Sequence, residues 1–119
     1  HRLSTESSVH YLILPAIRYI ESNYQNPKLS NTDLAEQCNI SEVYFRKIFT
    51  ETYKTTPKQF IVDIRINKAK QLLSEGFLNI GTVAEECGFS NQYHFCRLFK
   101  EKTGVTPTEY MKQNRIYKI

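Results

Sequence analysis

Tryptophan is absent from this sequence of 119 residues, and glycine and proline occur only four times each. Cysteine occurs three times. An odd number of cysteines, without a regular framework or a signal-like apolar leader, argues against a disulfide-bonded secreted domain and predicts a reducing compartment. No apolar run approaches the roughly 18 residues that a membrane-spanning helix needs. We therefore expect a cytoplasmic protein without a membrane segment.

Length and charge set two further limits. A chain of 119 residues suffices for one compact domain with a core, or for two very small ones, and is not a large enzyme. Lysine and arginine number 16 against 12 acidic residues, giving a net charge of +4 and an isoelectric point near 9.0. This mild excess favours polyanionic partners. We interpret the polar stretch 1–9 as a lead-in from a missing upstream domain.

Apolar residues recur mostly at spacings of three and four, while the alternation typical of strands is scarce. This periodicity predicts an all-α fold. The expected helices lie at about 10–23, 31–38, 42–53, 57–74, 80–87, 91–103 and 107–115.

The chain contains an internal repeat. The stretch "LAEQCNIS" at 34–41 matches "VAEECGFS" at 83–90. After one inserted residue, "FRKIFTETYKTTPKQF" at 45–60 matches "FCRLFKEKTGVTPTEY" at 95–110. Two copies of one pattern predict two similar structural units in a single chain.

Each copy has the pattern of a helix-turn-helix. Ala35 and Ala84 are small residues at the point where two helices must approach closely. Four positions later, Asn39 and Gly88 tolerate the left-handed backbone conformation of a tight turn. Apolar residues then follow at spacings that pack a second helix onto the first. A single match would be weak support, but two aligned copies are strong.

The repeat also predicts how the chain is divided. A first helix-turn-helix subdomain at 10–56 follows the lead-in, a linker helix occupies 57–75, and a second subdomain occupies 76–119. Thr56 and Thr106 each precede a proline and then, at the third helical position, a glutamine or glutamate. That is a capping box with a proline start, so each threonine is expected to open a helix.

The cysteines and the histidine near the second copy resemble a metal or thiol site at first sight. Cys38 and Cys87 occupy the same apolar position of the repeat, so we expect both in the core. His94 and Cys96 are two residues apart on one predicted helix and point roughly 160° from each other, so they cannot readily share an ion. Neither zinc-finger spacing nor a CxxC pair is present. His94, which aligns with Tyr44, is expected to be partly buried.

The second helix of each copy, about 42–53 and 91–103, has an outward face in helical projection. Tyr44 and His94 fall on the buried sides with the phenylalanines. The opposite sides suit the DNA major groove, where arginine grips guanine, glutamine pairs with adenine and apolar groups touch the thymine methyl. The predicted base-reading residues are Val43, Arg46, Lys47, Gln92, Tyr93, Cys96 and Arg97.

Further polar residues are expected to contact the DNA backbone, which positions a protein without specifying sequence. Ser41 and Ser90 precede the two recognition helices and are also expected to be their N-caps. The role of Glu42 is left open, because phosphates repel a carboxylate unless it accepts a hydrogen bond from a cytosine amino group. The predicted backbone contacts are Ser41, Thr50, Lys54, Lys58, Ser90, Asn91, Lys100 and Lys102.

The linker helix carries a wide apolar arc, as expected if it contacts both subdomains. About 18 residues make it roughly 27 Å long. Held rigidly, the two recognition helices could enter successive major-groove turns about 34 Å apart. A monomer could then read a bipartite site.

Two other classes of function compete with this hypothesis. A helical protein-interaction module could use the same outward faces to bind an acidic protein, and it would lack the steep salt dependence of DNA binding. An enzyme or thiol sensor centred on Cys96 is the other alternative. No Ser/His/Asp or Cys/His arrangement of credible spacing accompanies this cysteine. We expect no catalytic residue, no cofactor and no metal.

Four stretches of the chain resemble the DNA-binding domain of AraC/XylS-type transcription regulators, from about Pro15 to Asn114. They are "AIRYIESNY", "LAEQCNISEVYFRKIF", "FIVDIRINKAKQLL" and "IGTVAEECGFSNQYHFCRLFKEKTGVTPTEY". The resemblance implies seven helices with two helix-turn-helix units, promoter binding that usually activates through RNA polymerase, and an effector-sensing, dimerising or receiver domain upstream. It implies base-reading roles for the same seven residues. Asn39-Ile40 and Cys96 depart from the family's Gly-aromatic turn and small polar reader.

Overall fold

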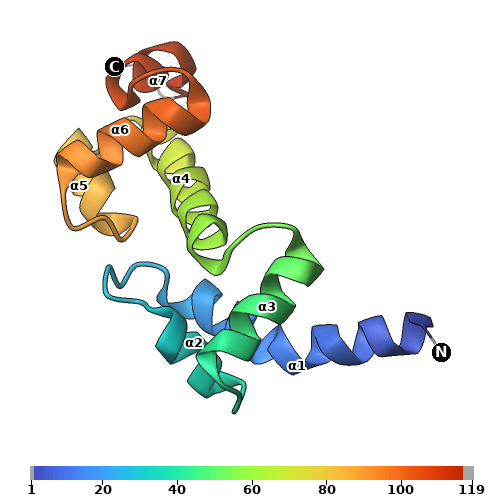
Figure 1. The fold of residues 1–119 in the computed structure, drawn as a ribbon. Coiled ribbons are helices and arrows are strands. Elements are labelled where there is room, and N and C mark those ends of the chain that lie inside the picture. The colour runs from blue at the N-terminus through green and yellow to red at the C-terminus, as the bar shows by residue number, and fades with distance from the viewer. Residues whose placement is uncertain (1, 117–119) are drawn as a thin grey trace. The chain divides into compact units, whose positions relative to one another are not determined.

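The structure, a computed structural model, describes the backbone of residues 2–116 and the side chains of residues 9–116. Regular secondary structure in this part of the chain is entirely α-helical, which confirms the predicted fold class (Figure 1). The helices are α1 (Arg2–Asn23), α2 (Asn31–Gln37), α3 (Glu42–Tyr53), α4 (Pro57–Glu75), α5 (Ile80–Glu86), α6 (Gln92–Thr103) and α7 (Pro107–Asn114). Residue 1 of the predicted lead-in and residues 117–119 of the predicted second subdomain lie outside the described residues.

The first helix was predicted to begin too late. α1 begins at Arg2 instead of at about residue 10, so the stretch interpreted as a lead-in is helical from that residue on. Residues 1–9 contain neither glycine nor proline, so no strong breaker interrupts the helix there. Their polar composition lacks the periodic apolar signal that marks the rest of α1. The other helices begin and end within one residue of the predicted positions.

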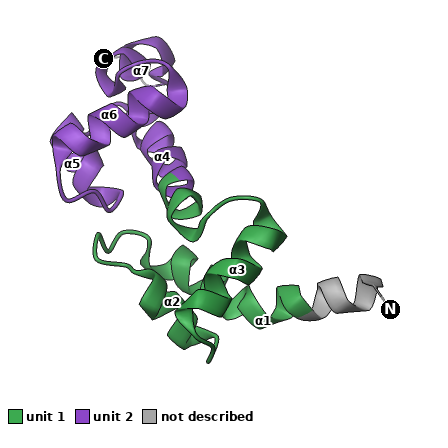
Figure 2. Cartoon of the chain, in the orientation of Figure 1, with its two compact units in different colours: residues 1–62 green, residues 63–119 purple. Residues whose placement is uncertain are grey.

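The chain forms two compact units, unit 1 (His1–Val62) and unit 2 (Asp63–Ile119), shown in Figure 2. The division falls inside α4, whose first residues belong to unit 1 and whose remainder belongs to unit 2. Each unit contains one helix-turn-helix copy and has its own core.

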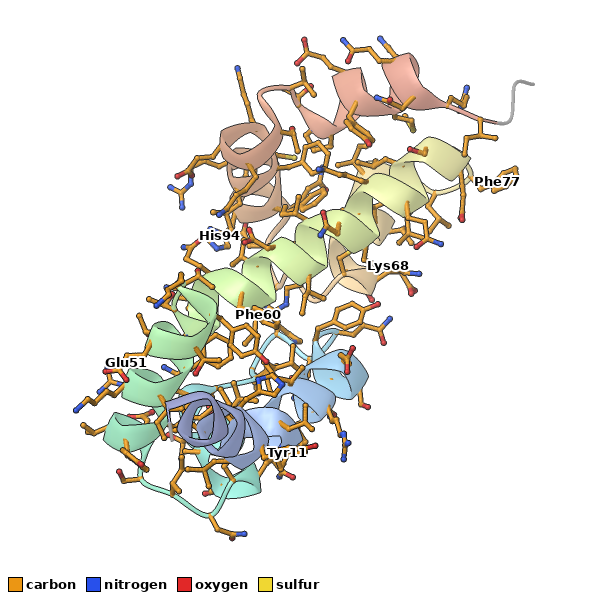
Figure 3. All side chains as sticks on the ribbon, turned by 90° about the vertical axis from the view of Figure 1, so that its right-hand side faces the viewer. Tyr11, Glu51, Phe60, Lys68, Phe77 and His94 are labelled. Atoms are coloured by element: carbon orange, nitrogen blue, oxygen red, sulfur yellow. The ribbon has the colours of Figure 1, made fainter. Side chains whose placement is uncertain are left out.

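The core of unit 1 lies where α1, α2 and α3 contact one another. Phe45 and Phe49, one turn apart on α3, are fully buried with their ring centroids 5.7 Å apart. Phe60 points from α4 into this cluster (Figure 3) and stands edge-on to Phe49 at 5.2 Å. The buried members from the other helices and the turn include Ile13, Ala16, Ile20, Leu34, Ala35, Cys38, Ile61 and Val62.

Unit 2 repeats this arrangement on α6. Phe95 and Phe99 are fully buried, again with centroids 5.7 Å apart. Tyr110 of α7 stands edge-on to Phe99 at 5.4 Å, as Phe60 does to Phe49 in unit 1. Other buried members are Ile66, Ala69, Leu73, Val83, Ala84, Cys87 and Phe89. The predicted core positions of the two aligned cysteines are therefore confirmed.

Both turns adopt the left-handed conformation that the sequence predicts. Asn39 has a φ of 57° and Gly88 a φ of 95°. The N–H of Ile40 donates to the Ala35 carbonyl at 3.3 Å, and the N–H of Asn39 donates to the Glu36 carbonyl at 3.1 Å. Unit 2 has the same pair of bonds, at 2.9 and 3.1 Å. This is a Schellman closure, which satisfies helix-terminal carbonyls and fixes the direction in which the next helix leaves.

The N-caps of the two recognition helices differ from the prediction in one place. Ser41 caps α3 as predicted and accepts a hydrogen bond from the Tyr44 N–H at 3.1 Å. Ser90 was predicted to cap α6, but the cap is Asn91, whose Oδ1 accepts from the His94 N–H at 3.1 Å. The residue inserted between the two matching segments explains the error, because Asn91 stands 50 residues after Ser41. Asparagine caps a helix as well as serine does.

α4 and α7 begin at the prolines where the sequence predicts, and α7 has the full capping box. Thr106 Oγ1 accepts from the Glu109 N–H at 3.1 Å, and the Glu109 carboxylate accepts from the Thr106 N–H at 2.9 Å. The backbone bond from Thr106 is the main reason that the pKa of Glu109 is lowered. In α4, Thr56 Oγ1 accepts from the Gln59 N–H at 3.2 Å.

We expect Asn91→Ala to lower the free energy of unfolding of unit 2 by about 1 kcal/mol, because the His94 N–H loses its acceptor. Ser90→Ala is the matched control, one residue earlier, and should change that free energy by less than about 0.5 kcal/mol. Urea unfolding followed by far-ultraviolet circular dichroism measures both. A larger loss for Ser90→Ala than for Asn91→Ala would contradict the assignment of the cap.

Candidate nucleic-acid interface

The outward face of α3 carries two cationic residues, a threonine and an aliphatic residue. Val43 is 69% exposed, and Arg46, Lys47 and Thr50 are exposed as well. Because Phe45, Ile48 and Phe49 hold the opposite face in the core, the helix cannot rotate without unburying them. The exposure predicted for these α3 residues is confirmed, and they form one contiguous surface.

The outward face of α6 differs from that of α3 in its residue types and in having a hollow. Gln92 and Arg97 are exposed, and Tyr93 is 89% exposed. Cys96 was predicted to be exposed but is half-buried, because it adjoins Phe95 at the margin of the core-facing side. A shallow hollow of about 200 Å³ is lined by Gln92, Tyr93 and Cys96.

The predicted burial of Tyr44 and His94 is wrong. Tyr44 is 47% exposed, and His94 is exposed and projects from α6 (Figure 3). Tyr44 and His94 each come directly before a fully buried phenylalanine. Because that phenylalanine fills the core at this point of the helix, the preceding side chain lies at the edge of the buried face. The apolar stripe on these helices is narrower than the helical projection suggested.

His94 instead has a partner on the outward face. The Arg97 guanidinium donates from Nη2 to His94 Nδ1 at 3.1 Å. Arginine has donors only, so this bond requires His94 Nδ1 to be unprotonated. The imidazole also stands edge-on to Phe89, with centroids 6.4 Å apart. His94 therefore positions a predicted base reader, and the signal for it was its spacing of three residues from Arg97 on one helix.

Glu42, which the sequence left without a role, also has a partner. Thr32 Oγ1, on the first turn of α2, donates to Glu42 Oε1 at 3.1 Å. The bond joins the two helices of the first helix-turn-helix and holds the carboxylate back toward α2. Sequence reasoning missed Thr32 because the two residues are ten positions apart across a turn, a distance at which no helical periodicity applies.

The residues predicted to contact the DNA backbone fall into three groups. Ser41 and Asn91 are N-caps whose side-chain oxygens already accept a main-chain hydrogen bond. The Nζ of Lys102 lies 3.0 Å from Asp63 Oδ1 of α4, so its charge faces its own unit. The third group comprises the remaining members, which are exposed like the others: Thr50, Lys54, Lys58, Ser90 and Lys100. Lys54 also has a φ of 60°, at the place where unit 2 has Gly104 with a φ of 86°.

The thiols in both units are poor nucleophiles. Burial raises the pKa of Cys96 and of Cys38, and it raises the pKa of Cys87 to about 11. The thiolate is the reactive form of cysteine, so at neutral pH these groups behave as small apolar side chains. Within residues 9–116 no three His, Cys, Asp or Glu side chains are grouped as metal ligands would be. No helix in the described part of the chain is long and apolar enough to cross a membrane.

Two helix-turn-helix units, each presenting one outward helix face, define a DNA-binding domain, and comparison with known proteins agrees. A family described as "Helix-turn-helix domain" matches residues 34–113. The chain belongs to the AraC-type helix-turn-helix family of transcription regulators. The chain is therefore a sequence-specific DNA-binding domain of a transcription regulator. The family resemblance predicted from the sequence is therefore confirmed.

Individual relatives support the assignment. The HTH-type transcriptional regulator ArgR of Pseudomonas aeruginosa is 30% identical over 108 residues, which are 91% of this chain and 32% of that protein. The C-terminal domain of AraT, a response regulator from Geobacillus stearothermophilus, has a TM-score of 0.85 at 28% identity and covers 90% of this chain and 88% of its own. An AraC-type transcriptional regulator from Chromobacterium violaceum has a TM-score of 0.80 at 25% identity and covers 94% and 99%. The chain spans about a third of the length of the first curated relatives.

We expect iodoacetamide to modify Cys96 before Cys38 and Cys87, because Cys96 is half-buried and the other two are buried. Burial raises the pKa of Cys96 above its ordinary value of 9.0. The thiolate fraction, and with it the rate, should therefore still increase with pH above 9.0. Peptide mapping by mass spectrometry over a pH series measures this. A rate that reaches its plateau below pH 8 would contradict the burial argument, and Cys96→Ser is the control for reaction at the other two thiols.

Proposed function

We propose that α3 and α6 read two half-sites of a promoter by direct contact in the major groove of double-stranded DNA. The observation that carries this proposal is the equivalence of the two outward faces. Five positions on each helix stand 50 residues apart. They follow an equivalent turn and N-cap and lie away from the two buried phenylalanines, and of these ten residues only Cys96 is half-buried. A recognition helix of a helix-turn-helix enters the major groove with such a face.

The chemistry of the two faces differs, so we propose that the two half-sites differ in sequence. On α3, Arg46 and Lys47 are proposed to bind guanine O6 and N7, with Val43 against an apolar base edge. On α6, Arg97 is proposed to bind guanine and Gln92 to pair with adenine, while Tyr93 and Cys96 provide apolar contacts. The site would then be a bipartite sequence that is not a palindrome.

Contacts to phosphates are proposed for the exposed polar residues that flank these faces. The exposed lysines attract the DNA backbone without reading sequence. Lys102 is the weakest member of the set, because its ammonium group is already paired with Asp63. Ser41 and Asn91 cap the recognition helices, and the N-terminal turns that they begin suit a phosphate through the helix dipole. The residues proposed are Ser41, Thr50, Lys54, Lys58, Ser90, Asn91, Lys100 and Lys102.

Signal sensing and contact with RNA polymerase are proposed for the longer protein of which this domain would be a part. Because curated relatives are about three times as long as this chain, we propose an effector-sensing or receiver domain upstream of it. One structural relative is described as a response regulator, which is in keeping with a receiver domain. We further propose that the protein acts in a bacterial cytoplasm, where the chromosome lies, and activates transcription through contact with RNA polymerase.

The double substitution of Arg46 and Arg97 by alanine tests the readers. We expect it to weaken binding to the selected site by about a hundredfold or more, because each arginine–guanine contact contributes roughly 1–3 kcal/mol. Helicity should not change, since both side chains are exposed. Selection from a randomised duplex library provides the site, and fluorescence anisotropy measures the affinity. Arg18→Ala with Lys112→Ala, which removes the same charge from exposed positions of α1 and α7, is the control.

The salt dependence of DNA binding distinguishes this proposal from the alternative that the domain is a protein-interaction module. If the domain binds DNA, the logarithm of the affinity should fall linearly with the logarithm of the salt concentration, with a slope of about one per phosphate contacted. Unchanged affinity in the double arginine variant would contradict the assignment of the readers. No enrichment of any duplex would contradict DNA reading by this domain alone.

A further inference from the structure

Gly81 occupies an unexpected place for a glycine. It lies in the first turn of α5, a helix of only seven residues, and glycine is one of the residues that least favour a helix. A Cβ atom added at this position would lie 3.0 Å from Gln92 Oε1 and 3.5 Å from Asn79 Oδ1. The Gln92 side chain therefore folds back over the first turn of α5, close enough that a side chain at position 81 would displace its amide.

Unit 1 shows the same relation with different groups. Thr32 precedes Gly81 by 49 residues, and Glu42 precedes Gln92 by 50, so the two pairs are equivalent in the repeat. Thr32 Oγ1 donates to Glu42 Oε1 at 3.1 Å. In both units the first side chain of the recognition helix rests on the first turn of the preceding helix. The residue on that turn decides where the side chain points.

The position of the Gln92 side chain matters because it forms one wall of the hollow on α6. The other residues that line it are Tyr93, which is 89% exposed, and the half-buried Cys96. An aromatic ring and a neutral thiol suit an apolar guest. About 10–15 Å³ measured in this way holds one water molecule, so a hollow of about 200 Å³ has room for a methyl group and the ring edge that bears it.

We propose that this hollow receives the 5-methyl group of a thymine in the half-site read by α6, and that Gly81 keeps the hollow open by leaving room for the Gln92 side chain. The thymine methyl is the apolar group that base pairs present in the major groove. An A·T pair presents it on the same edge as the adenine atoms that a glutamine amide binds, so Gln92 and the hollow together suit that pair. This inference rests on the proposed function, because the hollow lies on the face proposed to read bases.

Replacement of each thymine of the selected site by deoxyuridine tests the guest, because it removes the methyl group and leaves the hydrogen-bonding groups in place. We expect one such replacement in the α6 half-site to weaken binding about fourfold, the amount expected for one buried methyl group. The α6 half-site is the one whose sequence preference is lost in Arg97→Ala. A half-site without thymine, or with every replacement changing the affinity by less than about 1.5-fold, would overturn the proposal.

Gly81→Thr tests the positioning role, because it places in unit 2 the residue that unit 1 has at the equivalent position. We expect the variant to fold, since the atom nearest to the new Cβ is the end of a flexible side chain. Its preference for thymine over deoxyuridine should fall from about fourfold toward one. Gly81→Ala, which needs a smaller movement of the amide, should lie in between.

Two comparisons separate this role from a merely structural one. A glycine that mattered only for helix stability would, on substitution, change the melting temperature and leave the thymine-to-deoxyuridine ratio unchanged, and that result would overturn the role of Gly81. Thr32→Val, the matched substitution in unit 1, should leave the ratio in the α6 half-site at about fourfold. Failure of the domain to enrich any duplex would instead count against the proposed function, which keeps the two outcomes distinct.

Discussion

The outward faces of α3 and α6 depend on a pair of phenylalanines one helical turn apart. In each unit the two rings are fully buried with centroids 5.7 Å apart, and a third ring from the next helix stands edge-on to the second of them. This contact fixes the rotation of the recognition helix about its axis, because any rotation would expose two large aromatic side chains. The positions proposed to read bases follow from that rotation, since they lie away from these phenylalanines on the same turns.

The direction of each recognition helix has a separate cause. The Schellman closure after α2 and after α5 consumes the last carbonyls of the first helix and turns the chain through one left-handed residue. The cap then satisfies the first amides of the second helix, through Ser41 in unit 1 and Asn91 in unit 2. With both ends of the turn closed by hydrogen bonds, the loop between the helices has little freedom to redirect the reader. The orientation of each recognition helix therefore depends on the hydrogen bonds at the two ends of this short turn.

Much of this was readable from the sequence, and the errors have local causes. Helix positions, turns and cores could be predicted because each copy repeats the same spacing of apolar and turn residues. Asn91 was missed as a cap because the copies differ by one residue next to it. His94 and Cys96 sit at the margin of the buried face, where a helical projection cannot decide exposure. The contacts of Thr32 with Glu42, and of Gly81 with Gln92, join two helices across a turn, and no periodicity records such pairs.

The Schellman turn also has a consequence for how such a domain can change over generations. The turn is closed by main-chain atoms, and the rotation of the helix is set by residues that face inward, so neither depends on what the outward positions carry. The two copies in this chain already differ at all five of those positions: Glu42 and Gln92, Val43 and Tyr93, Arg46 and Cys96, Lys47 and Arg97, Thr50 and Lys100. After such a duplication, substitutions at the outward positions of one unit can change which DNA sequence it prefers while its fold stays the same.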